Sequence, residues 1–184
     1  MLDVLHEPLL PWGLRAFLAL LFATAAISKL GGLEEFYGVV RNFRLLPEGL
    51  ARPVAVVLPV MELAIAAGLL VTPLAVPAAI AAAGLLAAFG LAIAINVIRG
   101  RTWIDCGCFH NGMKQRISWL VVGRNALLTA LALAVAGLLP QAGAGGALDA
   151  LVGLMAGAVM MMLYFSISML GGIAAAQAST LKGR

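Results

Sequence analysis

Long apolar runs dominate the chain, and short polar segments separate them. Five runs reach or approach the roughly 20 residues that a helix needs to cross the ~30 Å hydrocarbon core of a bilayer. They predict membrane-spanning helices at about 12–29, 53–71, 73–98, 118–139 and 147–174. The segment VTPLAVP predicts a tight turn between the second and third spans, because proline is favoured in the first turn of a helix. The hydrophobic pattern therefore predicts an all-α integral membrane protein.

Two longer connections interrupt the apolar runs. In residues 33–46, apolar side chains recur at helical spacing among charged ones, which predicts an amphipathic helix lying in the membrane interface. The other connection, residues 99–117, joins the third and fourth spans and holds both cysteines. We expect residues 1–184 to form a single membrane domain. Small-xxx-small pairs such as Gly153 and Gly157 allow close helix contacts, although they are also consistent with a general richness in Ala and Gly.

Composition supports the membrane assignment. The chain is 63% hydrophobic and 11% charged, with a mean hydropathy of +1.06, whereas soluble domains are about 45–50% apolar and about 25% charged. The net charge is +4, but the basic residues cluster between apolar runs. This distribution indicates membrane orientation rather than nucleic-acid binding. No Lys or Arg precedes Arg15, so we expect the first run to be a retained anchor rather than a cleaved signal peptide.

Basic residues gather on one side of the predicted bundle. With five spans, the two longer connections and the C-terminal tail share a side, and they hold 10 of the 12 basic residues. These are Lys29, Arg41, Arg44, Arg52, Arg99, Arg101, Lys114, Arg116, Lys182 and Arg184. Cytoplasmic loops carry an excess of Lys and Arg. In a bacterial-type inner (plasma) membrane, the count therefore predicts an N-terminus outside and a cysteine-containing connection at the cytoplasmic face.

The segment WIDCGCFHNG holds the only two cysteines, Cys106 and Cys108. Two cysteines alone cannot form a four-thiolate zinc site or hold an iron–sulfur cluster, and no C-x-x-C-H haem attachment motif is present. One interpretation is a dithiol that cycles to a disulfide, since Gly107 adds no Cβ to the small ring that the bridge closes. Such a bridge is expected to be strained, and therefore oxidising and labile.

Two other interpretations of the cysteines stay open. Two thiolates can bind a soft metal such as Cu(I), with His110 as a third ligand, which would make the chain a metal carrier. The thiols can also be inert small hydrophobes in a non-catalytic assembly factor. Neighbouring basic residues favour thiolates, whereas Asp105 opposes them. The basic neighbours are Arg99, Arg101, Lys114 and Arg116.

Polar residues inside the spans are the second candidate for chemistry. Glu62 lies within the second span, Arg124 and Asn125 lie within the fourth, and Lys29 ends the first. Ionisable groups in membrane helices are costly and usually face a partner or a polar cavity. We expect Glu62 to pair with Arg124 or Lys29 beneath the 99–117 connection. This cluster either locks the bundle together or lines a cavity through which a thiol, a quinone or a proton reaches the cysteines.

The segment DCGCFHNGMKQRISWLVVGRNALL resembles the signature of the MauE family, within the broader DoxX-like membrane proteins. In that family a C-G-C-F motif precedes a helix with an R-N pair, matched here by Cys106, Cys108, Arg124 and Asn125. FATAAISKLGGLEEFYGVVRNFRLLP and LPVMELAIAAGLL resemble the first two helices of the family. The resemblance covers about residues 12–140.

The resemblance implies a DoxX-like bundle of four core transmembrane helices plus a fifth C-terminal one, with the interfacial helix between the first and second. MauE proteins are linked to maturation of methylamine dehydrogenase, whose small subunit carries many disulfides, and they act with a thioredoxin-like partner outside the cytoplasm. The implied function is a membrane thiol–disulfide oxidoreductase or electron relay, with quinone as a candidate carrier. Its candidate site residues are Cys106, Cys108, Glu62, Arg124, Lys29 and Asn125. An extracytoplasmic role places the cysteines outside, in conflict with the charge count.

Overall fold

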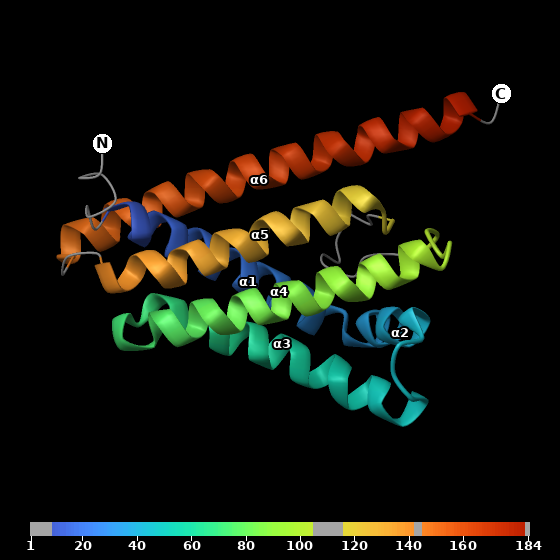
Figure 1. Ribbon diagram of the computed structural model, residues 1–184, viewed down its shortest axis with the longest axis horizontal. Coiled ribbons are helices and arrows are strands. Elements are labelled where there is room, and N and C mark those ends of the chain that lie inside the picture. The colour runs from blue at the N-terminus through green and yellow to red at the C-terminus, as the bar shows by residue number, and fades with distance from the viewer. Residues whose placement is uncertain (1–8, 105–115, 142–144, 183–184) are drawn as a thin grey trace.

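The computed structural model describes residues 9–104, 116–141 and 145–182, with side chains described as far as residue 169. All the regular secondary structure in this part of the chain is helical (Figure 1). The helices are α1 (Leu9–Gly31), α2 (Leu33–Phe43), α3 (Glu48–Leu70), α4 (Ala75–Ile98), α5 (Trp119–Leu138) and α6 (Ala147–Lys182). Short 3₁₀ turns cover Thr72–Leu74 and Leu139–Gln141. The predicted all-α membrane fold is confirmed.

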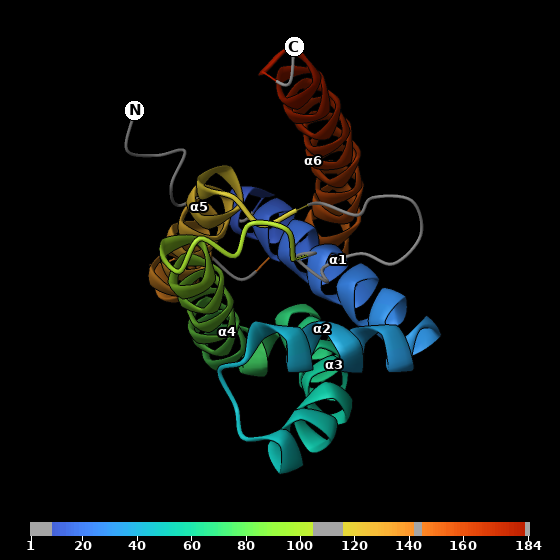
Figure 2. The same cartoon turned by 90° about the vertical axis from the view of Figure 1, so that its right-hand side faces the viewer.

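Five helices in the described residues are long and apolar enough to cross a membrane. They are α1, α3, α4 with its preceding 3₁₀ turn, α5 and the first part of α6. Viewed along the bundle, α1 lies centrally, with α3 and α6 packed against it, while α4 packs against α5 and α3 (Figure 2). The short helix α2 lies across the end of the bundle, against α3. Its buried Phe36 and Phe43 and its exposed Glu34 and Glu35 fit the predicted amphipathic pattern.

The core is built largely from alanines and a few large side chains. Ala79 and Ala82 of α4 are fully buried, together with Leu18 of α1 and Leu69 of α3. Because alanine side chains are short, the helix backbones approach one another closely in this region. A second, smaller cluster lies at the end of the bundle that α2 covers. It contains Phe43, Ile93, Val97, Ile104, Ile117 and Val121.

Helix α6 crosses α1 at two glycines. A Cβ atom added to Gly157 would lie 2.6 Å from the Cβ of Ala16, and one added to Gly153 would lie 2.6 Å from the Cβ of Trp12. Neither position has room for a side chain. The predicted small-xxx-small pair on α6 is therefore used for direct helix contact.

Several helix boundaries differ from the sequence prediction. Helix α2 ends at Phe43 rather than near residue 46, because Arg44 adopts the left-handed conformation (φ 48°) and stops the helix. Helix α3 begins at Glu48 rather than at Pro53 and continues through both of its prolines. Helix α6 runs to Lys182, beyond the expected end near residue 174.

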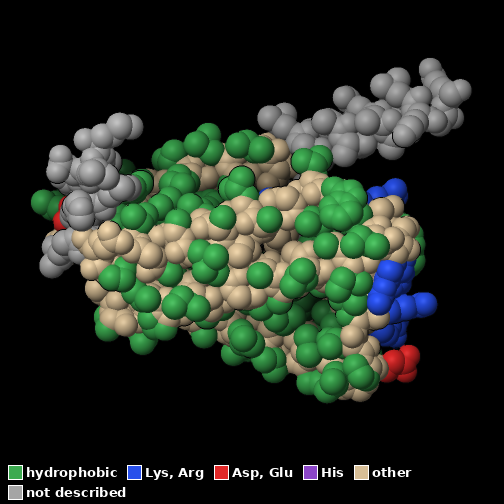
Figure 3. Space-filling model, in the orientation of Figure 1, with side chains coloured by type: hydrophobic (Ala, Val, Ile, Leu, Met, Phe, Trp, Pro, Cys, Tyr) green, Lys and Arg blue, Asp and Glu red, His purple; other side chains and the backbone are tan. Residues whose placement is uncertain are grey.

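Charged side chains are segregated along the bundle. In Figure 3 the visible Lys and Arg side chains gather at one end, beyond a surface that is otherwise largely hydrophobic. This is the end where α1, α4 and α6 finish and where α3 and α5 begin (Figure 1). We call it the basic end. The predicted separation of charge between the two ends is therefore present in the folded structure.

Candidate functional site

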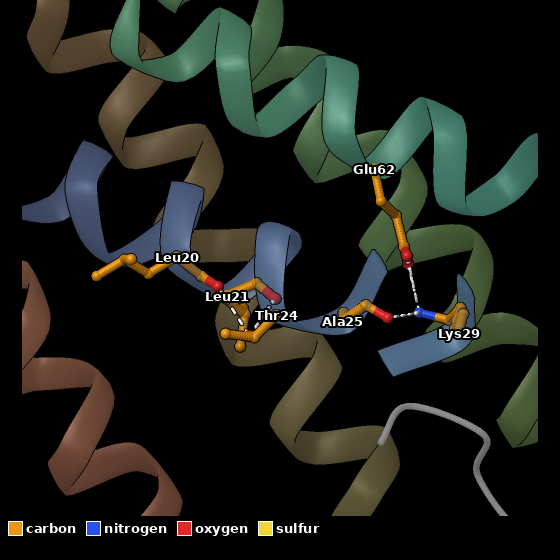
Figure 4. Close-up of polar contacts among 6 residues, drawn as sticks. All are labelled: Leu20, Leu21, Thr24, Ala25, Lys29 and Glu62. Carbon is orange, nitrogen blue, oxygen red and sulfur yellow. Dashed lines mark hydrogen bonds and ion pairs between the residues drawn. The ribbon is translucent and has the colours of Figure 1, made fainter. Parts of the chain in front are cut away.

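A buried ion pair joins α1 to α3 near the basic end. The Nζ of Lys29 lies 2.7 and 2.8 Å from the two carboxylate oxygens of Glu62 (Figure 4). It also donates a longer hydrogen bond of 3.5 Å to the carbonyl oxygen of Ala25. The Lys29 and Glu62 side chains are only 4% and 3% exposed. The predicted pairing of Glu62 with Lys29 is confirmed.

The surroundings of this pair are aromatic and apolar. The Nζ of Lys29 lies 5.4 Å from the ring centre of Phe36 in α2 and 5.7 Å from that of Phe89 in α4. Both distances allow cation–π attraction. Removing two charges from water is costly, and the cost is offset only when the charges meet each other with good geometry. Here three hydrogen-bond contacts occupy the ammonium group, so the pair forms a fixed link where α1, α2, α3 and α4 meet.

Arg124 and Asn125 occupy different surroundings on α5. Asn125 is buried, donates a hydrogen bond of 2.9 Å to the carbonyl of Val121, and packs against Gly90 of α4. A Cβ added to Gly90 would lie 3.3 Å from the Cβ of Asn125, so glycine allows α4 and α5 to approach here. The guanidinium carbon of Arg124 lies 5.9 Å from the ring centre of Tyr164, which connects α5 to α6. Asn125 therefore lies where α5 packs on α4, and the Arg124 side chain reaches towards α6.

The connection that carries the cysteines is held at both of its described ends. Cys106, Cys108 and His110 lie outside the described residues. Ile104 precedes these residues in the chain and Ile117 follows them. The backbone N–H of Ile117 donates a 3.0 Å hydrogen bond to the carbonyl of Ile104. Ile104 and Ile117 are 3% and 1% exposed, within the smaller apolar cluster. The base of the connection is thus part of the packed bundle.

Arg101 fixes the backbone close to that base. Its guanidinium donates to the carbonyls of Asn42 (2.8 Å) and Phe43 (3.4 Å) and to the Oδ1 of Asn96 (3.2 Å). Since the carbonyls at a helix C-terminus lack partners within the helix, Arg101 caps α2 while connecting it to α4. One basic residue from the cysteine-containing connection therefore has a defined structural role.

Arg15 is an internal polar residue whose role the sequence did not reveal. It is 2% exposed, and its guanidinium donates to the carbonyls of Leu69 (2.8 Å) and Leu70 (3.1 Å) at the end of α3. It also lies 3.9 Å from the ring centre of Trp12. The sequence signal that could have indicated this role is the position of Arg15, three residues after Trp12 within the first apolar run. Arg15 caps α3 at the end of the bundle opposite the basic end.

The metal interpretation has no support among the described residues, where no group of three or more His, Cys, Asp or Glu side chains is placed to hold an ion. Its proposed ligands, Cys106, Cys108 and His110, lie in the part of the chain that is not described. The copper-carrier hypothesis therefore stays a prediction from the sequence.

These features, together with the C-G-C segment of the sequence, define a multi-pass, all-α membrane protein with a buried ion pair near its basic end. The family model described as "Methylamine utilisation protein MauE" matches residues 7–140. The chain belongs to the MauE family.

The curated relatives extend this match over nearly the whole chain. The methylamine utilization protein MauE of Paracoccus versutus is 66% identical over 186 residues, covering 100% of both chains. That of Paracoccus denitrificans is 61% identical, again over 100% of both chains. That of Methylophilus methylotrophus is 41% identical, covering 89% of this chain and 86% of the relative. No solved structure matches the chain.

Proposed function

We propose that the chain supports methylamine utilisation as a membrane thiol–disulfide exchange protein that uses Cys106 and Cys108. The relatives are named for methylamine utilisation, and the C-G-C segment supplies the only thiols of the chain. The observation that carries the proposal is the hydrogen bond between Ile104 and Ile117, which closes the base of the cysteine-containing connection where both side chains are buried in the bundle.

The anchor limits how far the thiols can move from the bundle. A chain extends by at most about 3.6 Å per residue. Cys106 is two residues from Ile104, so their Cα atoms are within about 7 Å of each other. Arg101 and Arg116 belong to the same connection and stand on either side of the cysteines in the sequence. Nearby positive charge lowers the free energy of a thiolate relative to a thiol. The basic end therefore suits thiol exchange.

The reaction proceeds by two exchange steps. A thiolate of the partner protein attacks one sulfur of the Cys106–Cys108 disulfide, and the S–S bond breaks as a mixed disulfide forms. A second partner thiolate then displaces the cysteine. The partner leaves with a disulfide, while Cys106 and Cys108 hold the two electrons as thiols. A two-electron acceptor, either a quinone or an oxidised thioredoxin-like protein, restores the disulfide by taking two electrons and two protons.

The polar residues inside the bundle position this site. In the proposal, Lys29 and Glu62 fix α1 against α3 beneath the thiol site. Asn125 sets the packing of α5, the helix that follows the cysteine-containing connection. Arg124 contributes positive charge from α5. None of these four is assigned a bond-making step.

The test uses the fact that the chain has only two cysteines. We expect a maleimide-linked polymer to add two units to the reduced wild-type protein and none to the oxidised protein on a gel. C106S and C108S should each form a mixed disulfide with glutathione, and neither should support growth on methylamine. The double variant is the matched control, because it cannot react. Growth of both single variants at the wild-type rate would contradict the proposal.

A further inference from the structure

An apolar pocket of about 250 Å³ opens between α2, α3 and α4. All of its wall residues are hydrophobic, including Phe36 and Phe43 of α2, Leu58 of α3, and Ala88 and Phe89 of α4. Figure 3 shows a hollow among hydrophobic side chains close to the basic end. The volume is slightly below the roughly 300–1,000 Å³ typical of pockets for drug-sized ligands. Its size and lining suit a flexible hydrocarbon chain.

A cationic residue in an unusual conformation adjoins this pocket. Arg44 lies between Phe43 and Leu45, which are both wall residues, and its side chain is exposed. Its φ of 48° is uncommon for a residue other than glycine, and such conformations persist only where the surrounding structure holds them. Here Arg101 holds the left-handed conformation of Arg44, because its guanidinium donates to the carbonyls of Asn42 and Phe43 immediately before that residue.

We propose that this pocket binds an acyl chain of an anionic membrane phospholipid, with the phosphate beside Arg44. Basic pockets between membrane helices near the surface bind anionic head groups. The apolar wall then takes the chain, and the basic residue meets the charge. The pocket and the arginine are thus complementary to the two halves of one lipid molecule.

A quinone ring fits this pocket less well. The wall offers no side-chain donor for the carbonyl oxygens of a quinone. The buried Nζ of Lys29 lies 5.4 Å from the ring centre of the wall residue Phe36, but Glu62 and the carbonyl of Ala25 already accept its hydrogen bonds. The occupant is therefore assigned as a lipid whose charge lies outside the pocket. This inference does not depend on the thiol chemistry.

The experiment measures lipid binding to the delipidated full-length protein by native mass spectrometry. Phosphatidylglycerol and phosphatidylethanolamine with identical acyl chains are titrated separately. We expect one equivalent of phosphatidylglycerol to bind about fivefold more tightly, as one well-placed basic residue at the membrane surface allows. A88F places a ring in the pocket and should weaken binding at least about tenfold, since the hydrocarbon chain loses buried contact.

Matched controls separate the pocket from general effects. Ala81 is exposed on α4, seven residues before Ala88 and outside the pocket wall, so A81F should bind like the wild type. R44Q should remove the preference for phosphatidylglycerol. R99Q changes an exposed arginine at the same end of the bundle and should keep that preference.

Four results would overturn the inference. They are wild-type affinity in A88F, equal affinity of the wild type for the two phospholipids, a retained preference for phosphatidylglycerol in R44Q, and displacement of phosphatidylglycerol by an equimolar ubiquinone. If A88F does not fold, as judged by size-exclusion chromatography and thermal unfolding, R44Q decides the question through the lipid preference alone. Retained preference in R44Q then rejects the proposed site.

Discussion

Four of the buried polar residues in this bundle, Lys29, Glu62, Arg15 and Asn125, are held by named hydrogen-bond partners. Lys29 and Glu62 satisfy each other, Arg15 satisfies the last carbonyls of α3, and Asn125 satisfies a carbonyl within its own helix. A buried polar group without a partner costs a large free energy. These contacts therefore explain how an apolar bundle can contain charged residues.

Breaking the Lys29–Glu62 pair should destabilise the protein strongly. E62Q or K29M leaves one buried charge without its partner, which costs about 3–5 kcal/mol in comparable cases. The double variant K29M/E62M should recover part of this loss, because neither charge remains. Thermal unfolding in detergent, followed by intrinsic fluorescence, ranks the stabilities of the wild type, the two single variants and the double variant.

The exposed pair of Arg52 and Glu34 serves as the control for that cycle. Its N–O distance is 3.0 Å, similar to that of the buried pair, but its side chains are 72% and 75% exposed. Surface pairs contribute at most about 1 kcal/mol, so R52Q and E34Q should change stability little. Equal losses at the two pairs would show that burial does not decide the effect of Lys29 and Glu62.

At the scale of the helices, the packing of α6 on α1 depends on glycine. A Cβ at Gly157 would lie 2.6 Å from the Cβ of Ala16 and 2.7 Å from the backbone nitrogen of Phe17. G157A must push the two helices apart, and overpacking of this kind costs about 1–3 kcal/mol. Thermal unfolding should therefore shift to a lower temperature in G157A.

Gly84 provides the control for the crossing. It is exposed on α4, and a Cβ added there would have no neighbouring atom within 4 Å. G84A should leave stability unchanged or raise it slightly, since alanine is the better helix former. If G84A lowers stability as much as G157A does, the loss in G157A is not specific to the contact with α1.

The sequence predicted the elements better than their ends. Hydrophobic runs predicted all five long helices, because a span must be about 20 apolar residues whatever its neighbours are. The end of α2 at Phe43 depends on Arg101, which contacts α2 from 58 residues away, and no local pattern records such a contact. The pairing of Lys29 with Glu62, and the role of Arg15, likewise depend on how the helices are arranged.

At the scale of the whole molecule, the structure sharpens the charge asymmetry. Arg15 is the only Lys or Arg that the described residues place at the end opposite the basic end, and its side chain is buried. The exposed Lys and Arg side chains of the described residues therefore lie towards the basic end. Cytoplasmic loops are enriched in these residues, so we propose that the basic end faces the cytoplasm.

This orientation predicts where a membrane-impermeant maleimide reacts. After reduction, Cys106 and Cys108 should be labelled in inverted vesicles and protected in intact spheroplasts. In a variant lacking both cysteines, L148C places a thiol at the exposed start of α6, on the opposite end, and it should be labelled only in spheroplasts. Reversal of both patterns would mean that the family's disulfide role, rather than the charge distribution, indicates the correct side. Labelling of all three positions from one side would contradict the five-span arrangement itself. In that arrangement α5 crosses the membrane between the cysteine-containing connection and the start of α6, so the two lie on opposite faces.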